Sequence, residues 1–243
     1  IAQRFVSDKV DLICAIATPA AQSVANATRD IPIVGTAITD YVSAKLAQSN
    51  AVPGGNVTGT SDLNPIKQQI DLLMKIYPNA KTIGTIYSSS EINSEIQIKT
   101  MTEYAQSKGL TVRAATVSTV NDIQQAAQSL VGDVDVFYEP TDNVISSSIP
   151  TLVSVTDAAG KGVICAEPFM VTGGCLATYG IDYYKLGVQT GEMAADILEG
   201  KSKPANMPIE TARDLTLVIS KSGIEKLGLT IPEDVLKDAT LVD

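Results

Sequence analysis

Two loops near the start of the chain, residues 15–22 and 35–40, carry hydroxyl groups where an apolar run ends. A threonine at the start of a helix, preceded by small residues, leaves room for an anion such as a carboxylate beside free backbone N–H groups. Thr18 and Asp40 are equally explained as caps of their own helices, so both roles stay open. The candidate ligand-binding residues of these loops are Thr18, Pro19, Ala37 and Thr39.

Three later loops, residues 87–94, 137–143 and 166–174, add hydroxyl, amide, carboxylate and aromatic groups. Asp142 is the strongest candidate, because a carboxylate in a cleft forms a charge-assisted hydrogen bond with a ligand ammonium. Capping of the following helix is the alternative role for Asp142, as it is for the serines of the first of these loops. The candidate residues are Ser90, Asn93, Tyr138, Asp142, Asn143, Glu167 and Phe169.

The chain contains no His, which removes the commonest general base and a common metal ligand. A Ser-His-Asp or Cys-His relay is therefore impossible, and no cysteine pair has metal-site spacing. No dinucleotide or P-loop glycine motif is present. We expect a binding protein without cofactor or metal. A carboxylate-based α/β enzyme using Asp142 and Glu167 is the remaining catalytic alternative, although no nucleophile–base spacing supports it.

Composition describes a globular protein with an acidic surface. The 243 residues are 44% hydrophobic and 19% charged, with a net charge of −9, which argues against disorder and against nucleic acid as a partner. Cys14 and Cys165 lie in apolar runs, as buried small side chains do. Spacing leaves open whether Cys165 and Cys175 form a disulfide.

Apolar β-branched runs alternate with amphipathic stretches along the chain, which predicts parallel sheets covered by helices. The expected strands are 10–17, 31–38, 56–60, 82–87, 110–117, 134–138, 163–166, 176–181 and 215–219. The expected helices are 19–28, 41–48, 65–76, 93–108, 121–130, 146–159, 184–198 and 221–227, before a capped segment from Pro232. So many strands are too many for one sheet of this length, and a Pro-containing break at 58–65 suits a hinge. We therefore predict two doubly wound lobes, residues 1–60 with 183–207 and residues 61–182 with 208–243.

Five segments, in this order, resemble the ABC-transporter substrate-binding lipoproteins of the tryptophan and tyrosine type, which have the type I periplasmic binding protein fold. They are ATPAAQ at 17–22, PGGNVTG at 53–59, SEINS at 90–94, PTDN at 140–143 and GIDYYKLG at 180–187. The resemblance implies two lobes joined by three crossovers, with a small ligand in the cleft between them.

By analogy with amino-acid binders of this fold, the ligand carboxylate would meet Thr18 and residues 37–39. The ammonium would meet Asp142, with Ser90 and Asn93 beside it. Tyr41, Tyr138, Phe169 and Tyr183 either line an aromatic pocket or pack in the core. The expected ligand is an amino acid, and an aromatic one is among the candidates; a branched aliphatic amino acid, a nucleoside or a sugar stays open.

The resemblance also implies an extracytoplasmic, periplasmic or lipid-anchored monomer that delivers its ligand to an ABC permease in the membrane. The family has a strand–helix–strand unit before the segment that begins here at Ile1, so the first lobe is expected to lack that unit, and a targeting signal is expected upstream. A ligand-sensing domain of a receptor or transcriptional repressor, which shares the fold, is the alternative function.

Overall fold

The computed structural model describes residues 1–243, which divide into two compact units. Unit 1 comprises Ile1–Leu63 and Ile181–Asp214, and unit 2 comprises Asn64–Gly180 and Leu215–Asp243. The chain therefore passes between the units three times. Residues 208–214, expected in the second lobe, belong to unit 1, because Glu210–Thr211 forms a strand that pairs with Val57–Ser61.

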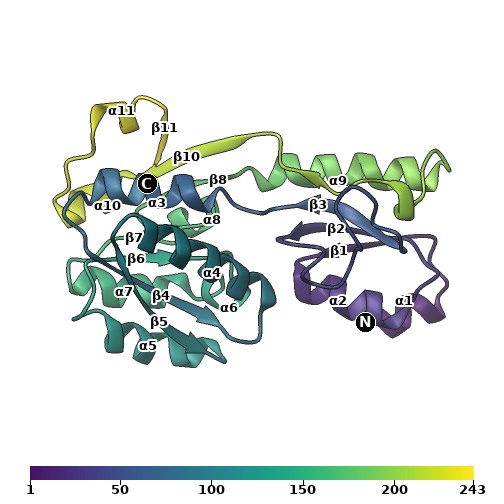
Figure 1. Ribbon diagram of the computed structural model, residues 1–243, viewed down its shortest axis with the longest axis horizontal. Helices are drawn as coiled ribbons and strands as arrows, with labels where there is room; N and C mark the ends of the chain where they lie inside the picture. Colours follow the sequence, from purple (N-terminus) through teal and green to yellow (C-terminus); the bar gives the residue numbers. More distant parts are fainter. The chain divides into compact units, whose positions relative to one another are not determined.

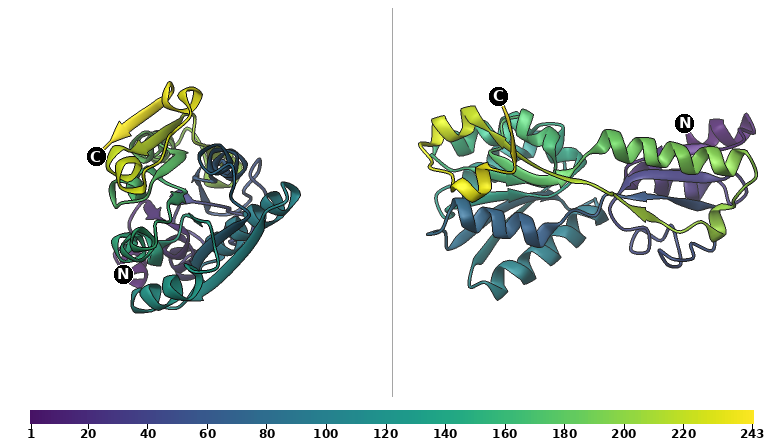
Figure 2. Two further views of the ribbon diagram at one scale, coloured as in Figure 1. Left: turned by 90° about the vertical axis from the view of Figure 1, so that its left-hand side faces the viewer. Right: turned by 90° about the horizontal axis from the view of Figure 1, so that it is seen from above.

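Unit 1 is a four-stranded sheet of order β1-β2-β3-β9, and its three strand pairs are parallel. Figure 1 shows α9 on one side of the strands and α1 and α2 on the other, and the right-hand view of Figure 2 shows the same long helix from above. The elements are α1 (Ala2–Ser7), β1 (Ile13–Ile16), α2 (Thr18–Ala27), β2 (Ile33–Ile38), β3 (Val57–Ser61), α9 (Tyr183–Leu198), the 3-10 turn η2 (Pro204–Asn206) and β9 (Glu210–Thr211).

The helix expected at 41–48 is absent, and the structure has turns there. Tyr41 is fully buried, and its hydroxyl donates a 3.0 Å hydrogen bond to the carbonyl of Thr60. Lys45 adopts a positive φ of 60°, which breaks any helical run. The apolar residues of this segment thus fold over the sheet as a loop.

Unit 2 is a seven-stranded sheet of order β11-β10-β8-β7-β6-β4-β5. Its strands are β4 (Thr82–Ser88), β5 (Thr111–Val117), β6 (Val136–Glu139), β7 (Val163–Cys165), β8 (Ala177–Ile181), β10 (Leu215–Ser220) and β11 (Ala239–Val242). Its helices are α3 (Ile66–Ile76), α4 (Ile92–Ser107), η1 (Val120–Asp122), α5 (Ile123–Leu130), α6 (Asn143–Ser146), α7 (Ile149–Ala158), α8 (Pro168–Thr172), α10 (Lys221–Leu227) and α11 (Glu233–Leu236).

Two hydrophobic cores cover the two faces of this sheet, and neighbouring side chains of β6 contribute to different cores. Successive strand side chains point to opposite faces. Tyr138 packs in one core with Ile70 of α3, and Phe137 packs in the other with Ile123 of α5. Both aromatic side chains are fully buried. The predicted doubly wound α/β architecture is confirmed in this unit by helices that cover both faces.

Local differences from the sequence expectations have steric causes. The helix expected at 146–159 is two helices, because Pro150 sits in the first turn of α7, a position that proline favours. Cys165 and Cys175 are buried free thiols, whereas Cys14, which was expected to be buried, is exposed because it lies on the uncovered face of β1. No helix has the length and hydropathy that crossing a bilayer requires.

Candidate functional site

In unit 1, the adjacent β1 and β2 both end in strained backbone. Ala17 has φ 72° and Ala37 has φ 52°, values that residues with a Cβ rarely adopt. The two ends are held together, because Ile16 pairs with Thr36 and the Ala17 amide donates to the Thr36 carbonyl at 3.0 Å. Strain of this kind gathers at ligand sites, which supports the prediction that these strand ends bind a ligand.

Thr18 does not cap its helix. The N-cap of α2 is Ala17, and no side chain accepts a hydrogen bond there. Thr18 is the first helical residue and is 3% exposed, while Pro19 is exposed beside it. The capping explanation of Thr18 is therefore wrong, and the anion-binding role stays a prediction. Asp40, in contrast, accepts from the amides of Val42 and Ser43 and so stabilises a turn.

Thr39 lies beside a buried carboxylate that the sequence analysis missed. Its hydroxyl donates to Asp62 Oδ1 at 3.2 Å, and the Tyr183 hydroxyl donates to Asp62 Oδ2 at 2.8 Å. Burial raises the pKa of Asp62, while these two hydrogen bonds lower it. Because the single hydroxyl proton of Thr39 is engaged with Asp62, it is not free for a ligand carboxylate. The Thr39 side chain thus serves the unit's own polar core.

In unit 2, Asp142 joins three elements at the carboxyl ends of β4 and β6. Its Oδ2 accepts from the Ser88 amide and the Ser94 hydroxyl, each at 2.7 Å, and its Oδ1 caps α6 through the Ile145 amide at 2.9 Å. Burial raises the pKa of Asp142, these hydrogen bonds lower it, and the nearby Glu91 carboxylate raises it. The helix-capping alternative is confirmed for Asp142, whose side chain is buried.

Glu91 gathers the predicted asparagines around a second carboxylate. Its Oε2 accepts from Asn143 Nδ2 at 2.6 Å and from Asn93 Nδ2 at 3.1 Å. The Asn93 amide nitrogen also donates to the carbonyl of Thr141 at 3.0 Å. Ser90, which is exposed, shares a hydrogen bond with Ser88. The structure thus brings Ser90, Asn93, Asp142 and Asn143 together at one sheet edge, as parallel strands that end side by side require.

Two amide oxygens in this cluster are buried and have no donor. They are Oδ1 of Asn93 and Oδ1 of Asn64. Asn64 Nδ2 donates to Thr141 Oγ1 at 2.7 Å, so both asparagines contact the same threonine. A buried acceptor without a donor costs about 1–3 kcal/mol, and such groups are rare in native proteins. These two oxygens are therefore acceptors that the donors of the protein itself leave unused.

The remaining predicted residues of unit 2 lie elsewhere. Tyr138 is in the core, where its hydroxyl donates to Gln69 Oε1 at 2.8 Å, so its predicted place in a pocket is wrong. Glu167 accepts from the Ser146 hydroxyl at 2.7 Å and precedes α8. Phe169 is 66% exposed on α8, and its role in ligand binding stays a prediction.

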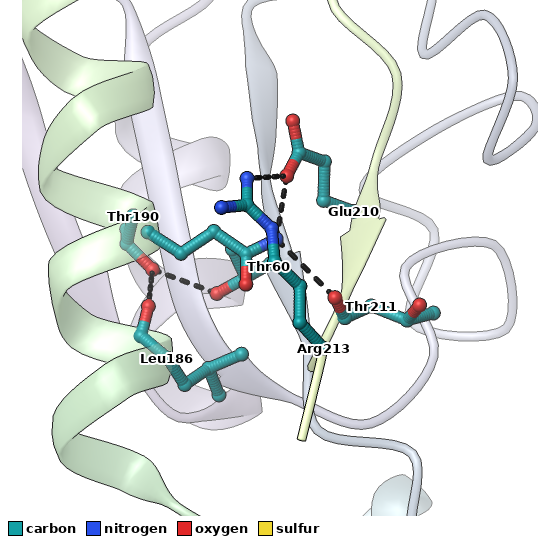
Figure 3. A network of polar contacts seen from close by, with 7 residues as sticks. Thr60, Leu186, Thr190, Glu210, Thr211 and Arg213 are labelled. Atoms are coloured by element: carbon teal, nitrogen blue, oxygen red, sulfur yellow. Dashed lines mark hydrogen bonds and ion pairs between the residues drawn. The ribbon is translucent and has the colours of Figure 1, made fainter.

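A separate polar network ties α9 to β3 and β9 in unit 1 (Figure 3). Thr190 donates to the Leu186 carbonyl and is hydrogen-bonded to Thr60 at 2.7 Å. Gln189 bridges Glu210 and the carbonyl of Thr211, and Arg213 pairs with Glu210. A groove of about 320 Å³ lies beside it. Both cations that line the groove are paired, Lys185 with Asp214 at 3.0 Å and Arg213 with Glu210 at 3.3 Å. This network stabilises unit 1 and explains why residues 208–214 belong to it.

Comparison with known proteins decides the family. The family described as ABC transporter substrate binding protein matches residues 1–243. The chain belongs to this family. It is 45% identical over 229 residues to the tyrosine-binding protein of Clostridioides difficile (strain R20291), a match that covers 94% of this chain. The chain spans 66% of that relative's length.

Solved structures agree with the family. An ABC domain from Streptococcus pneumonia, in complex with L-Trp, is 42% identical with a TM-score of 0.96 and covers 100% of this chain and 82% of its own. A conserved domain protein from Vibrio cholerae is 40% identical, also with a TM-score of 0.96, over 100% of this chain and 81% of its own. The predicted type I periplasmic binding protein fold and the substrate-binding protein family are confirmed.

Proposed function

We propose that this chain binds an aromatic amino acid and delivers it to an ABC permease. The observation that carries the proposal is its likeness, above 40% identity over nearly the whole chain, to a tyrosine-binding protein and to a domain that holds L-Trp. Family membership favours an importer component over the receptor and repressor alternative. The absence of His and of any nucleophile–base spacing also disfavours the enzyme alternative.

The chemistry of each unit supports a zwitterionic ligand. The strained ends of β1 and β2 beside Thr18 suit a carboxylate, because the first turn of α2 presents backbone N–H groups. The cluster of unit 2 is rich in acceptors and carries two carboxylates, so it suits an ammonium. The exposed ring of Phe169 is available to stack on an aromatic side chain.

The proposal extends to partner and location. A substrate-binding protein of this family works outside the cytoplasm beside its permease, and we propose a monomer there, anchored by lipid or free in the periplasm. Co-purification of the tagged protein with membranes, tested before and after globomycin treatment, separates a lipid anchor from a free form. Retention of the protein in the cytoplasm would contradict this part of the proposal.

Titration calorimetry with L-Trp, L-Tyr and L-Phe tests the ligand class, with L-Leu, glucose and adenosine as controls. We expect binding of at least one aromatic amino acid. At a concentration of 100 times its Kd, that ligand is also expected to raise the free energy of unfolding by about 2.7 kcal/mol. Binding of only a sugar or a nucleoside would reject the proposal. Turnover of any of these compounds would restore the enzyme alternative.

Thr18→Val tests the carboxylate side, because it removes the hydroxyl and keeps the shape. We expect its affinity for the amino acid to fall roughly 10-fold or more, since hydrogen bonds to a charged group are stronger than neutral ones. Thr28→Val is a matched control: Thr28 is buried, but its hydroxyl accepts from the amides of Asp30 and Ile31. Equal loss in both variants would reject the role of Thr18.

A further inference from the structure

Asn93 has an amide whose orientation is fixed by its neighbours. Its Nδ2 donates to Glu91 Oε2 at 3.1 Å and to the Thr141 carbonyl at 3.0 Å, two groups that only accept. Turning the amide over would place its oxygen against both of them, which is repulsive. Asn93 Oδ1 must therefore occupy its buried position without a donor from the protein.

The charges around this amide are all negative. Glu91 and Asp142 are 5% and 0% exposed, and neither forms an ion pair with a lysine or arginine. Their partners are amides and hydroxyls. Buried charges are usually paired, so the cluster lacks a cation as well as hydrogen-bond donors. A primary ammonium supplies one positive charge and three donors.

We propose that Asn93 and Asn64 accept the hydrogen bonds of the ligand ammonium through their Oδ1 atoms, while Glu91 and Asp142 supply the negative charge. This inference rests on the proposed function and names the residues that recognise the amine. It reassigns the direct contact from Asp142, whose oxygens already accept three hydrogen bonds, to the two asparagines. Glu91 acts as a positioning residue, because it orients Asn93.

The test compares two ligands that differ only in the amine, L-tryptophan and indole-3-propionate, on the same variants by calorimetry. Wild type is expected to prefer L-tryptophan by at least about 100-fold. In Asn93→Leu, which keeps the size and removes the acceptor, affinity for L-tryptophan falls roughly 10- to 100-fold, while that for indole-3-propionate stays within about 2-fold. Asn64→Leu behaves in the same direction.

Thr85→Val is the matched control, since Thr85 Oγ1 is another buried oxygen without a donor, on β4 of the same unit. Both affinities stay unchanged in it. Asn64→Leu, which is expected to lose affinity for L-tryptophan in the same way, carries the test if Asn93→Leu folds poorly.

The outcomes are separable. An equal loss of both ligands in Asn93→Leu and Asn64→Leu, or no loss of either, would overturn this inference and leave the proposed function standing. Failure of wild type to bind L-tryptophan, L-tyrosine and L-phenylalanine would overturn the proposed function, and this inference with it.

Discussion

The carboxylate of Asp142 accepts a hydrogen bond of 2.7 Å from the hydroxyl of Ser94, in the first turn of α4. The two residues are 48 positions apart, so this contact fastens the loop after β6 to the helix after β4. The same oxygen also accepts from the amide of Ser88 at the end of β4. Asp142 is therefore first a structural residue, which organises the edge of unit 2 where the asparagines meet.

Asp142→Ala is expected to lower the free energy of unfolding by about 2–4 kcal/mol, since it leaves three donors without an acceptor and removes the cap of α6. Urea unfolding followed by circular dichroism measures this. The variant is also expected to lose its response to the amino acid. Asp142→Asn serves as the milder comparison and should lose less stability. An Asp142→Ala protein of wild-type stability that fails to bind would instead assign Asp142 a direct contact.

Glu139 gives unit 2 a pH dependence of stability. Burial raises the pKa of this carboxyl well above its usual range, with a backbone hydrogen bond from Ile86 opposing the shift. The folded protein thus holds a proton that the unfolded chain has released, so the free energy of unfolding falls as pH rises through the interval between the two pKa values. Asp62 and Asp142 act in the same direction.

Glu139→Gln is accordingly expected to raise the urea midpoint at neutral pH and to flatten its decline as pH rises above the usual range of a carboxyl pKa. Glu95→Gln, on the exposed surface of α4, is the control and leaves the profile unchanged. A profile that keeps its full slope in Glu139→Gln would show that the dependence comes from other groups.

The neighbouring tyrosines at the start of α9 make a second matched pair. Tyr183 donates to the fully buried Asp62, whereas Tyr184 is 82% exposed. Tyr183→Phe is expected to cost about 1.5–3 kcal/mol of unfolding free energy, because a buried carboxylate loses a charge-assisted hydrogen bond. Tyr184→Phe is expected to change it by less than about 0.5 kcal/mol. Chemical denaturation measures the free energy of unfolding of both variants. Equal losses in the two variants would mean that the hydrogen bond between Tyr183 and Asp62 is energetically neutral.

Two glycines of unit 1 should respond to alanine in opposite ways. At Gly59, with φ +143°, an added Cβ would meet the carbonyl oxygen of Gly35 at 2.0 Å. Gly59→Ala is therefore expected to cost about 3 kcal/mol or more. Gly187 is inside α9, and nothing lies within 4 Å of an added Cβ, so Gly187→Ala should stabilise by roughly 0.5–1 kcal/mol. Thermal melts measure both, and a stable Gly59→Ala protein would contradict the tight β2–β3 packing.

Apolar runs and helix punctuation were sufficient to predict most of the architecture. The strand around Ile33 is buried on both faces and reads as a continuous β-branched run, and Gly228 ends α10 in the left-handed conformation that glycine favours. The pattern failed where a tertiary contact decides. Residues 41–48 have helical spacing, but the buried Tyr41 and the positive φ at Lys45 hold them as turns. The two residues of β9 are too few to show a period.

The candidate site could be predicted in outline, because the ends of the predicted strands show which loops lie at the edge of the sheet. The roles of the individual residues could not be predicted. Asn64 contacts Thr141 across 77 positions, and nothing in its own neighbourhood signals that contact. Glu91 lies within the predicted loop at 87–94. Its position between the hydroxyl of Ser90 and the amide of Asn93 was the sequence signal that could have identified it as a site residue. Glu91 is buried only when the start of α4 packs against the start of α6, where the Asn143 amide donates to its carboxylate.

The interleaving of the two units constrains how the protein can fold. Unit 1 needs α9 and β9, from residues 183–211, to complete a sheet that begins at Ile13, and unit 2 needs β10 and β11. During synthesis the first 63 residues emerge long before these partners, so their apolar faces remain open to aggregation or to a chaperone. Such distant contacts also slow folding. Unit 1 therefore cannot complete its sheet until synthesis has passed residue 211.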